Sequence, residues 1–240
     1  MQRRLVALAI VFCVTILAFV AAYSMPSQTP AHVPDTRAGV EFSAAAKQAP
    51  GQVVVAYLDG AELLLPVKQE STTAIAFHPV DNPNGVALTP GGDRAANDEA
   101  GGLANPSAAG DVSYYLMDGS ANAASPSTAG LDVGAVPGVL VYSPIEGKVT
   151  AVKTYKLLGS HADCEIDIQL TGDPTLLLVV THIVSPQAHV GDTVAAGVSI
   201  LGRLRAFPPE VQQGIRQFTN DAGDHVEMVA LRVSPNLAGF

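Results

Sequence analysis

The side chains that can carry out chemistry in this chain of 240 residues are mainly histidines and carboxylates. His225 and Glu227 are separated by one residue, and on a β-strand this spacing places both side chains on the same face. Imidazole and carboxylate groups bind divalent metal ions and transfer protons. Asp132 and His182 are further groups of this kind, although a lone Asp is typical of turns and a buried His is often satisfied by a backbone carbonyl.

Three segments, in order along the chain, resemble the LytM or lysostaphin-type zinc endopeptidases, which cleave the peptide cross-bridges of peptidoglycan. The first, from Gly130 to Val149, is similar to the family's Gly-x-Asp strand, Pro-Gly turn and apolar strand. The second joins Thr181-His182-Ile183 to the hairpin from Val190 to Gly202, and the third runs from Gly223 to Met228, where the family has Gly-x-His-x-His. The resemblance covers about 105 residues, a usual domain length. It implies a mainly β chain with a C-terminal LytM-like domain of the barrel-sandwich (duplicated hybrid motif) type.

The resemblance also implies a site. In the family, zinc is held by a His four residues before the Asp, by that Asp, and by the second His of His-x-His, which leaves a fourth position for water. Asp132 matches the Asp, whereas Thr128 and Glu227 stand at the two His positions. Asp132 and Glu227 are therefore the metal candidates, a pair that should bind zinc weakly and favour harder ions. His182 and His225 match the histidines that orient the water and stabilise the oxyanion, and are the catalytic candidates.

Other residues offer replacements for the missing imidazoles. His161 and Asp163 place two donors on one strand face, and His189 offers a third, but such residues are more often polar groups of connecting loops. His78 lies in a separate strand, immediately before Pro79, and matches no ligand position of the family. We therefore do not expect His78 in the site.

An apolar run from Leu5 to Tyr23 is long enough, as a helix, to cross the hydrocarbon core of a bilayer. Two arginines precede it and no charged residue follows until Asp35, so the positive-inside rule places the short N-terminus in the cytoplasm. We expect a single-pass protein of the cell membrane with an extracytoplasmic C-terminal domain, or a secreted protein if the segment is cleaved as a signal peptide.

Charge and motifs exclude several classes of function. The chain has 13 basic and 22 acidic residues, a balance that repels nucleic-acid phosphate and anionic lipid. The sequence has no Ser-His-Asp order, glycine-rich phosphate loop or Cys-x-x-Cys pair. Serine hydrolase, nucleotide-binding and redox interpretations therefore lack support.

Composition and turn signals divide the chain. The predicted order is a membrane segment at 1–23, a linker at 24–50, a small β region with a long loop at 51–120, a second linker at 121–129 and the LytM-like β domain at 130–235. Asp59-Gly60 supplies the positive φ of a tight hairpin between two apolar runs. The segment from Pro208 to Phe218 has apolar residues at helical spacing and is predicted as one helix.

The altered ligand positions favour a protein that is not an enzyme. The first hypothesis is a membrane-anchored binding or regulatory module at the cell wall, which contacts peptidoglycan peptides or an envelope protein without a cofactor. The first alternative is an active zinc endopeptidase in which Glu227 or an unrecognised His completes the cage. The second is an adaptor of an envelope complex, because the hairpin from Val190 to Gly202 also resembles lipoyl-type β-barrel domains.

Overall fold

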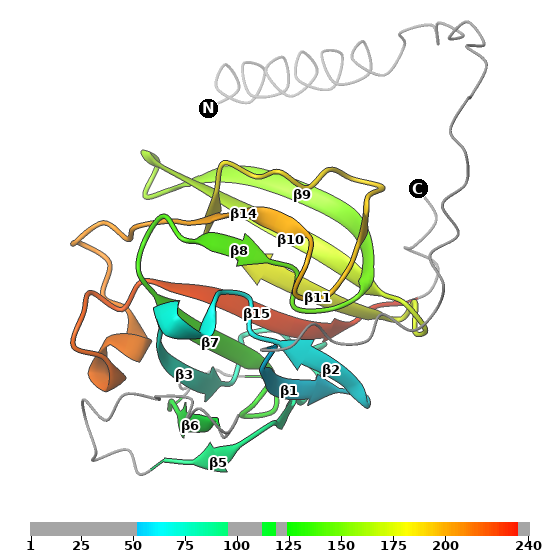
Figure 1. Cartoon of the computed structure of the whole chain (residues 1–240), viewed down its shortest axis with the longest axis horizontal. Coiled ribbons are helices and arrows are strands. Elements are labelled where there is room, and N and C mark those ends of the chain that lie inside the picture. Colours follow the sequence, from blue (N-terminus) through cyan, green and yellow to red (C-terminus); the bar gives the residue numbers. More distant parts are fainter. Residues whose placement is uncertain (1–51, 96–111, 119–123, 235–240) are drawn as a thin grey trace, which may run out of the picture. The chain divides into compact units, whose positions relative to one another are not determined.

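The computed structural model describes residues 52–95, 112–118 and 124–234 (Figure 1). Almost all regular structure in these ranges is β-strand, which confirms the mainly β prediction. Within the same ranges, no helix is both long and apolar enough to cross a membrane. The predicted membrane segment at 1–23 and the linker at 24–50 lie outside the described residues.

A nine-stranded sheet contains most of the strand residues in the described ranges, in the order β13-β9-β10-β11-β15-β7-β3-β6-β5. Its strands are β3 (Thr72–His78), β5 (Asp93–Arg94), β6 (Ser113–Leu116), β7 (Gly130–Ala135), β9 (Gly147–Leu157), β10 (His161–Leu170), β11 (Leu176–Thr181), β13 (Thr193–Val194) and β15 (His225–Arg232). Strand β3 pairs antiparallel with β7. A strand of the predicted 51–120 region therefore belongs to the same sheet as strands of the 130–235 region, while the domain boundaries themselves stay a prediction.

Two three-stranded sheets complete the architecture, in the orders β2-β1-β4 and β12-β14-β8. Their strands are β1 (Val54–Leu58), β2 (Ala61–Leu64), β4 (Thr89–Pro90), β8 (Leu140–Tyr142), β12 (Ile183–Val184) and β14 (Ile200–Leu204). Asp59 and Gly60 have φ of 50° and 86° between β1 and β2, so the predicted hairpin is confirmed. The composition of residues 81–111 predicts the long loop of the 51–120 region, and the short strands β4 and β5 lie within it.

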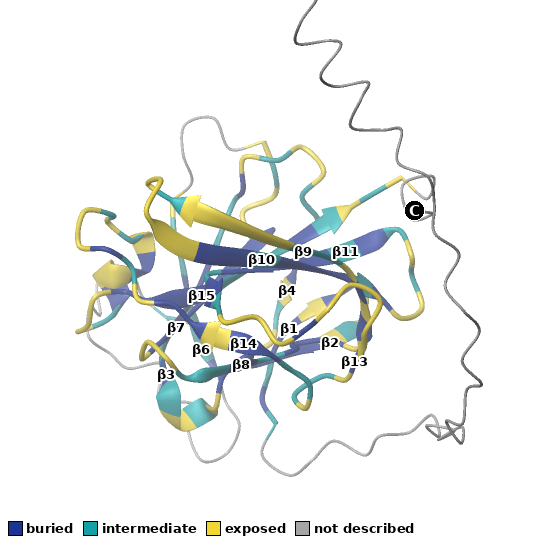
Figure 2. Ribbon diagram, turned by 90° about the horizontal axis from the view of Figure 1, so that it is seen from above, coloured by how far each residue is buried: buried dark blue, intermediate teal, exposed yellow. Residues whose placement is uncertain are grey.

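One apolar cluster joins the three sheets and fixes the register of the central strands. Ile166 on β10, Leu178 on β11 and Val226 on β15 are fully buried, and Figure 2 shows buried residues along these strands. Burying one such side chain stabilises the fold by about 1.5–3 kcal/mol. Because side chains alternate along a strand, fixing the apolar face also fixes which residues β7 and β15 present on the opposite face.

The helix predicted over 208–218 was wrong. The segment contains only a 3₁₀ turn, η2 (Gly214–Phe218), and Gly214 within it disfavours a helix. Ile215 and Phe218 are buried against the outer strands, and the Phe218 ring stacks on Tyr115 with centroids 4.2 Å apart. This packing holds η2 beside the group of polar residues on β3 and β7.

Candidate metal site and its flanking histidines

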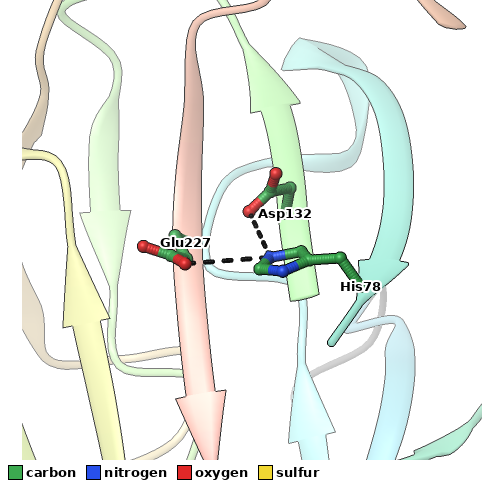
Figure 3. A group of neighbouring side chains, drawn as sticks. All are labelled: His78, Asp132 and Glu227. Atoms are coloured by element: carbon green, nitrogen blue, oxygen red, sulfur yellow. Dashed lines mark hydrogen bonds and ion pairs between the residues drawn. The ribbon is translucent and has the colours of Figure 1, made fainter. Parts of the chain in front are cut away.

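Three neighbouring strands bring one polar side chain each to the same place on the nine-stranded sheet. Asp132 of β7 lies directly opposite Glu227 of β15 on one side and Ala76 of β3 on the other. His78 follows Ala76 by two residues, so its side chain is on the same face as Asp132. The ligating atoms of His78, Asp132 and Glu227 all lie within 4.8 Å of one another (Figure 3).

The distances within this group fit a single small cation. His78 Nε2 lies 3.2 Å from Asp132 Oδ1 and 3.7 Å from Glu227 Oε1. Ligands bonded to a tetrahedral zinc ion at about 2.0 Å lie roughly 3.3 Å apart, so small movements of these side chains accommodate an ion. The group offers one imidazole and two carboxylates, a donor set that zinc, manganese and other divalent ions accept.

His78 is in the group, although we did not expect it there from the sequence. That expectation was wrong because His78 lies outside the three matching segments, so no family motif points to it. His78 lies opposite Gly130 in the β3–β7 pair, and a Cβ at Gly130 would collide with the His78 ring. The glycine of the Gly-x-Asp motif thus leaves room for the imidazole, but this link requires knowledge of which strand pairs with β7.

Two further histidines flank the group. His225 Nε2 lies 3.5 Å from Asp132 Oδ2, and His182 Nε2 lies 3.6 Å from Glu227 Oε2. The two imidazole rings meet edge to face with centroids 5.1 Å apart. The structure therefore brings together Asp132, His182, His225 and Glu227, the site residues predicted from the sequence, and adds His78; their roles stay predictions.

Each flanking histidine has a second partner behind it. His225 Nδ1 lies 2.8 Å from the carbonyl oxygen of Gly223, and His182 Nδ1 lies 3.1 Å from Asp163 Oδ2. The Phe207 ring packs against both imidazoles, at centroid distances of 4.6 Å to His182 and 5.1 Å to His225. Because both Nδ1 atoms have acceptors, each ring presents its Nε2 to the carboxylates of the metal group.

The three substitute ligands suggested by the sequence do not join the metal group. His161 is exposed at the start of β10, and the exposed His189 lies 3.6 Å from Asp192. Asp163 is buried and contacts His182 instead of reaching the candidate metal position. The structure thus separates these residues from the group around Asp132.

The electrostatics of the metal group are dominated by its carboxylates. Burial alone would lower the pKa of His78, but the hydrogen bond and charge of Asp132, the Pro79 carbonyl and Glu227 together raise it to about 9. Burial alone would raise the pKa of Asp132, but the charges of His225 and His78 lower it. Without a bound ion, a protonated His78 therefore balances the Asp132 carboxylate at neutral pH.

A cavity of about 330 Å³ opens over the group and the flanking histidines. Its other walls come from the end of β6 and from the η2 region, with Met117, Asp118, Gln213, Gly214 and Gln217. The volume lies at the lower end of the range for small-ligand sites. The candidate ligands are therefore reachable from solvent on the side where His182 and His225 present their Nε2 atoms.

Comparisons with known proteins give limited likenesses. No protein-family model and no curated protein matches the sequence. The chain is similar to lysostaphin with a TM-score of 0.33 and 18% identity, over 46% of this chain and 43% of lysostaphin. It is similar to the catalytic domain of the prophage-encoded M23 protein EnpA from Enterococcus faecalis with a TM-score of 0.32 and 22% identity, over 45% of this chain and 70% of that one.

A third likeness extends further along this chain. Helicobacter pylori Csd3 matches with a TM-score of 0.31 and 14% identity, over 75% of this chain and 37% of that one. The structural matches thus include lysostaphin and an M23 protein. The matched region spans less than half the length of lysostaphin.

Proposed function

We propose that this chain is a metal-dependent peptidase of the cell envelope that hydrolyses peptide bonds in peptidoglycan. The observation that carries the proposal is the convergence of His78, Asp132 and Glu227, with two imidazoles on their open side. Three protein ligands and one open position are the usual arrangement of a catalytic zinc site. A divalent ion held there would lower the pKa of a bound water and polarise the substrate carbonyl.

The flanking histidines can supply the proton transfers. With Nδ1–H of His182 donated to Asp163, and Nδ1–H of His225 donated to Gly223, each neutral ring has an accepting Nε2 on the cavity side. Such an imidazole can take a proton from a water molecule and, once protonated, donate a hydrogen bond to a substrate oxygen. Phe207 contacts both rings and restricts their rotation.

The substrate class and location come from the sequence. The motifs around Asp132, His182 and His225 resemble those of peptidoglycan endopeptidases, and we include the barrel-sandwich assignment of residues 130–235 in the proposal. A membrane anchor at residues 1–23 would hold the site on the outer side of the membrane, close to the cell wall. Hydrolysis of peptide cross-bridges is the reaction that fits both features.

A second function, a module that binds wall peptides or an envelope protein without cleaving, is favoured by one observation. His78 Nε2 lies within hydrogen-bonding distance of Asp132 Oδ1, and the two groups have oppositely shifted pKa values. A protonated His78 therefore stabilises the carboxylate without a metal ion. A site of this kind would keep its shape and lack the means to activate water.

The two functions differ in metal content and cleavage. The full chain is purified in detergent and dialysed first against buffer containing zinc or manganese and then against ion-free buffer. Two quantities are measured: the metal content of the chain and the release of peptides from purified peptidoglycan. One metal ion per chain and peptide release, both lost in Asp132→Ala and His78→Ala, support the peptidase. His189→Ala changes an exposed histidine outside the site and serves as the control. A metal-free chain that binds peptidoglycan and releases nothing would overturn the peptidase in favour of the binding module.

A further inference from the structure

Asp163 is a buried carboxylate outside the metal group that accepts several hydrogen bonds. Its exposed fraction is 2%, and Oδ1 accepts the backbone N–H of Cys164 at 2.8 Å. Oδ2 accepts from Arg205 Nη1 at 2.9 Å and from His182 Nδ1 at 3.1 Å, and the Tyr155 hydroxyl is a further partner. Burial alone would raise the pKa of Asp163, but the hydrogen bonds from His182, Arg205 and Cys164 lower it. Asp163 is thus a charged acceptor at neutral pH.

Arg205 offers a purely structural explanation for this carboxylate. Its side chain is 3% exposed, and its guanidinium lies 5.0 Å from the centre of the Phe207 ring. A buried arginine requires a counter-ion because an unpaired buried charge is strongly destabilising. The role of Asp163 toward His182 must therefore be separated from its role toward Arg205.

His182 is held in a conformation that its own backbone does not favour. Its φ is 67°, in the left-handed region that non-glycine residues rarely occupy unless their surroundings impose it. The surroundings here are the Asp163 carboxylate at Nδ1 and the rings of Phe207 and His225 on the sides. These contacts direct Nε2 toward Glu227, at 3.6 Å.

We propose that Asp163 is the positioning residue of the reaction, which fixes the ring orientation and the tautomer of His182 so that a bare Nε2 faces the cavity. The inference rests on the proposed peptidase function. A carboxylate that accepts Nδ1–H keeps a catalytic imidazole in one tautomer, and loss of such a partner leaves the ring free to present the wrong nitrogen. His225 has only the neutral Gly223 carbonyl at this position, so the two histidines differ in how firmly they are oriented.

The main test is Asp163→Asn in the full chain in detergent. The asparagine keeps the shape of the side chain, but its amide cannot accept from Cys164, Arg205 and His182 at once. We expect the rate of peptide release to fall about 10–100-fold with little change in KM. The chemical shifts of the two ring nitrogens of His182 are measured in protein with ¹⁵N-labelled histidine and are assigned by comparison with His182→Gln. In Asp163→Asn, these shifts should move away from the values of a ring that carries its proton on Nδ1.

Two variants separate positioning from a structural role. In the double variant Asp163→Asn with Arg205→Met, no buried charge is left unpaired, so we expect the thermal midpoint to recover while rate and ring-nitrogen shifts stay altered. Asp167→Asn changes another buried carboxylate of β10, which pairs with Lys153 and does not touch the histidines, and should leave both readouts at wild-type values. Recovery of the rate and shifts in the double variant would overturn the proposal.

Failure of the proposed function would be visible separately. If the wild-type chain releases no peptide, the peptidase is wrong, but the tautomer of His182 is still measured without substrate. Altered shifts in Asp163→Asn and in the double variant then still support positioning by Asp163. If both variants keep the wild-type ring-nitrogen shifts, and any measured rate of peptide release stays within about twofold of wild type, Asp163 does not position His182.

Discussion

On one side of the cavity, His78 Nε2 contacts the carboxylates of both Asp132 and Glu227. On the other side, His182 donates to Asp163, a carboxylate whose charge a buried arginine already balances. The first group has two anions and one titratable cation, so a divalent ion can replace the proton of His78. The second group has a permanent ion pair and aromatic neighbours. The group of His78, Asp132 and Glu227, here called the metal side, is therefore suited to exchange a cation. The group of His182 and Asp163 with its buried arginine, here called the histidine side, is suited to hold one geometry.

The largest effect is expected on zinc affinity, when the central ligand of the metal side is changed. Asp132→Asn removes the charge of the ligand that lies between the other two strands, and should lower zinc affinity more than 100-fold, since even outer-shell changes cost about 10–100-fold. Isothermal titration with zinc measures this. An affinity close to wild type would mean that the ion is held elsewhere and that the two sides do not differ as described.

The next largest effect concerns the fixed ion pair of the histidine side. Arg205→Met leaves Asp163 buried with only neutral partners and His182, and should lower the free energy of unfolding by about 3–5 kcal/mol. Urea unfolding followed by circular dichroism gives the value. Arg203→Met, at a more exposed position of β14, is the matched control and should cost far less. If both variants lose the same free energy of unfolding, the ion pair of Arg205 and Asp163 does not make the histidine side more fixed than the metal side.

A third prediction concerns which metal ion the metal side prefers. Glu227→His gives the group a second imidazole and should raise zinc affinity roughly tenfold relative to manganese, because imidazole suits zinc and carboxylate suits harder ions. Competition with a coloured chelator for each metal measures the ratio. An unchanged ratio would show that Glu227 does not contact the ion.

A smaller effect is expected from the glycine opposite His78. Gly130→Ala places a methyl group against the imidazole and should lower metal affinity by less than the loss of a ligand does, because the ring can move and still reach the ion with strain. The control is the same change in a His78→Ala background. If Gly130→Ala lowers metal affinity equally in that background, its effect does not pass through His78.

The smallest effect is a difference in acid sensitivity. The pKa of Asp163 is lowered in the folded state by His182, Arg205 and the Cys164 N–H, against the effect of burial. Its contribution to stability is complete above the unfolded pKa of about 4 and is lost as the pH falls through the lower folded value. Urea unfolding between neutral and acid pH should therefore show a shallower acid loss in Asp163→Asn. An identical slope would indicate that Asp163 carries no such shift.

Local patterns in the sequence predicted much of the fold. The predicted Asp59-Gly60 hairpin is present, and Cys164, Ile166 and Ile168, which stand at every second position, are buried on one face of β10. These features depend on the φ of a turn residue and on the period of two along a strand, which are set within a few residues. The helix predicted over 208–218 is absent: Gly214 interrupts the helical spacing, and the short turn η2 packs against Tyr115 instead.

The resemblance of three segments to the LytM-type endopeptidases, together with the spacing of His225 and Glu227, predicted Asp132, His182, His225 and Glu227 as candidates for one site. The folded chain places His78, 54 residues from Asp132, in the same group. It also places Asp163 behind His182 instead of beside the metal position. The pairing of β3 with β7 and the burial of Arg205 against β10 join residues that are far apart in the sequence. The spacing of residues within a short segment does not specify such contacts.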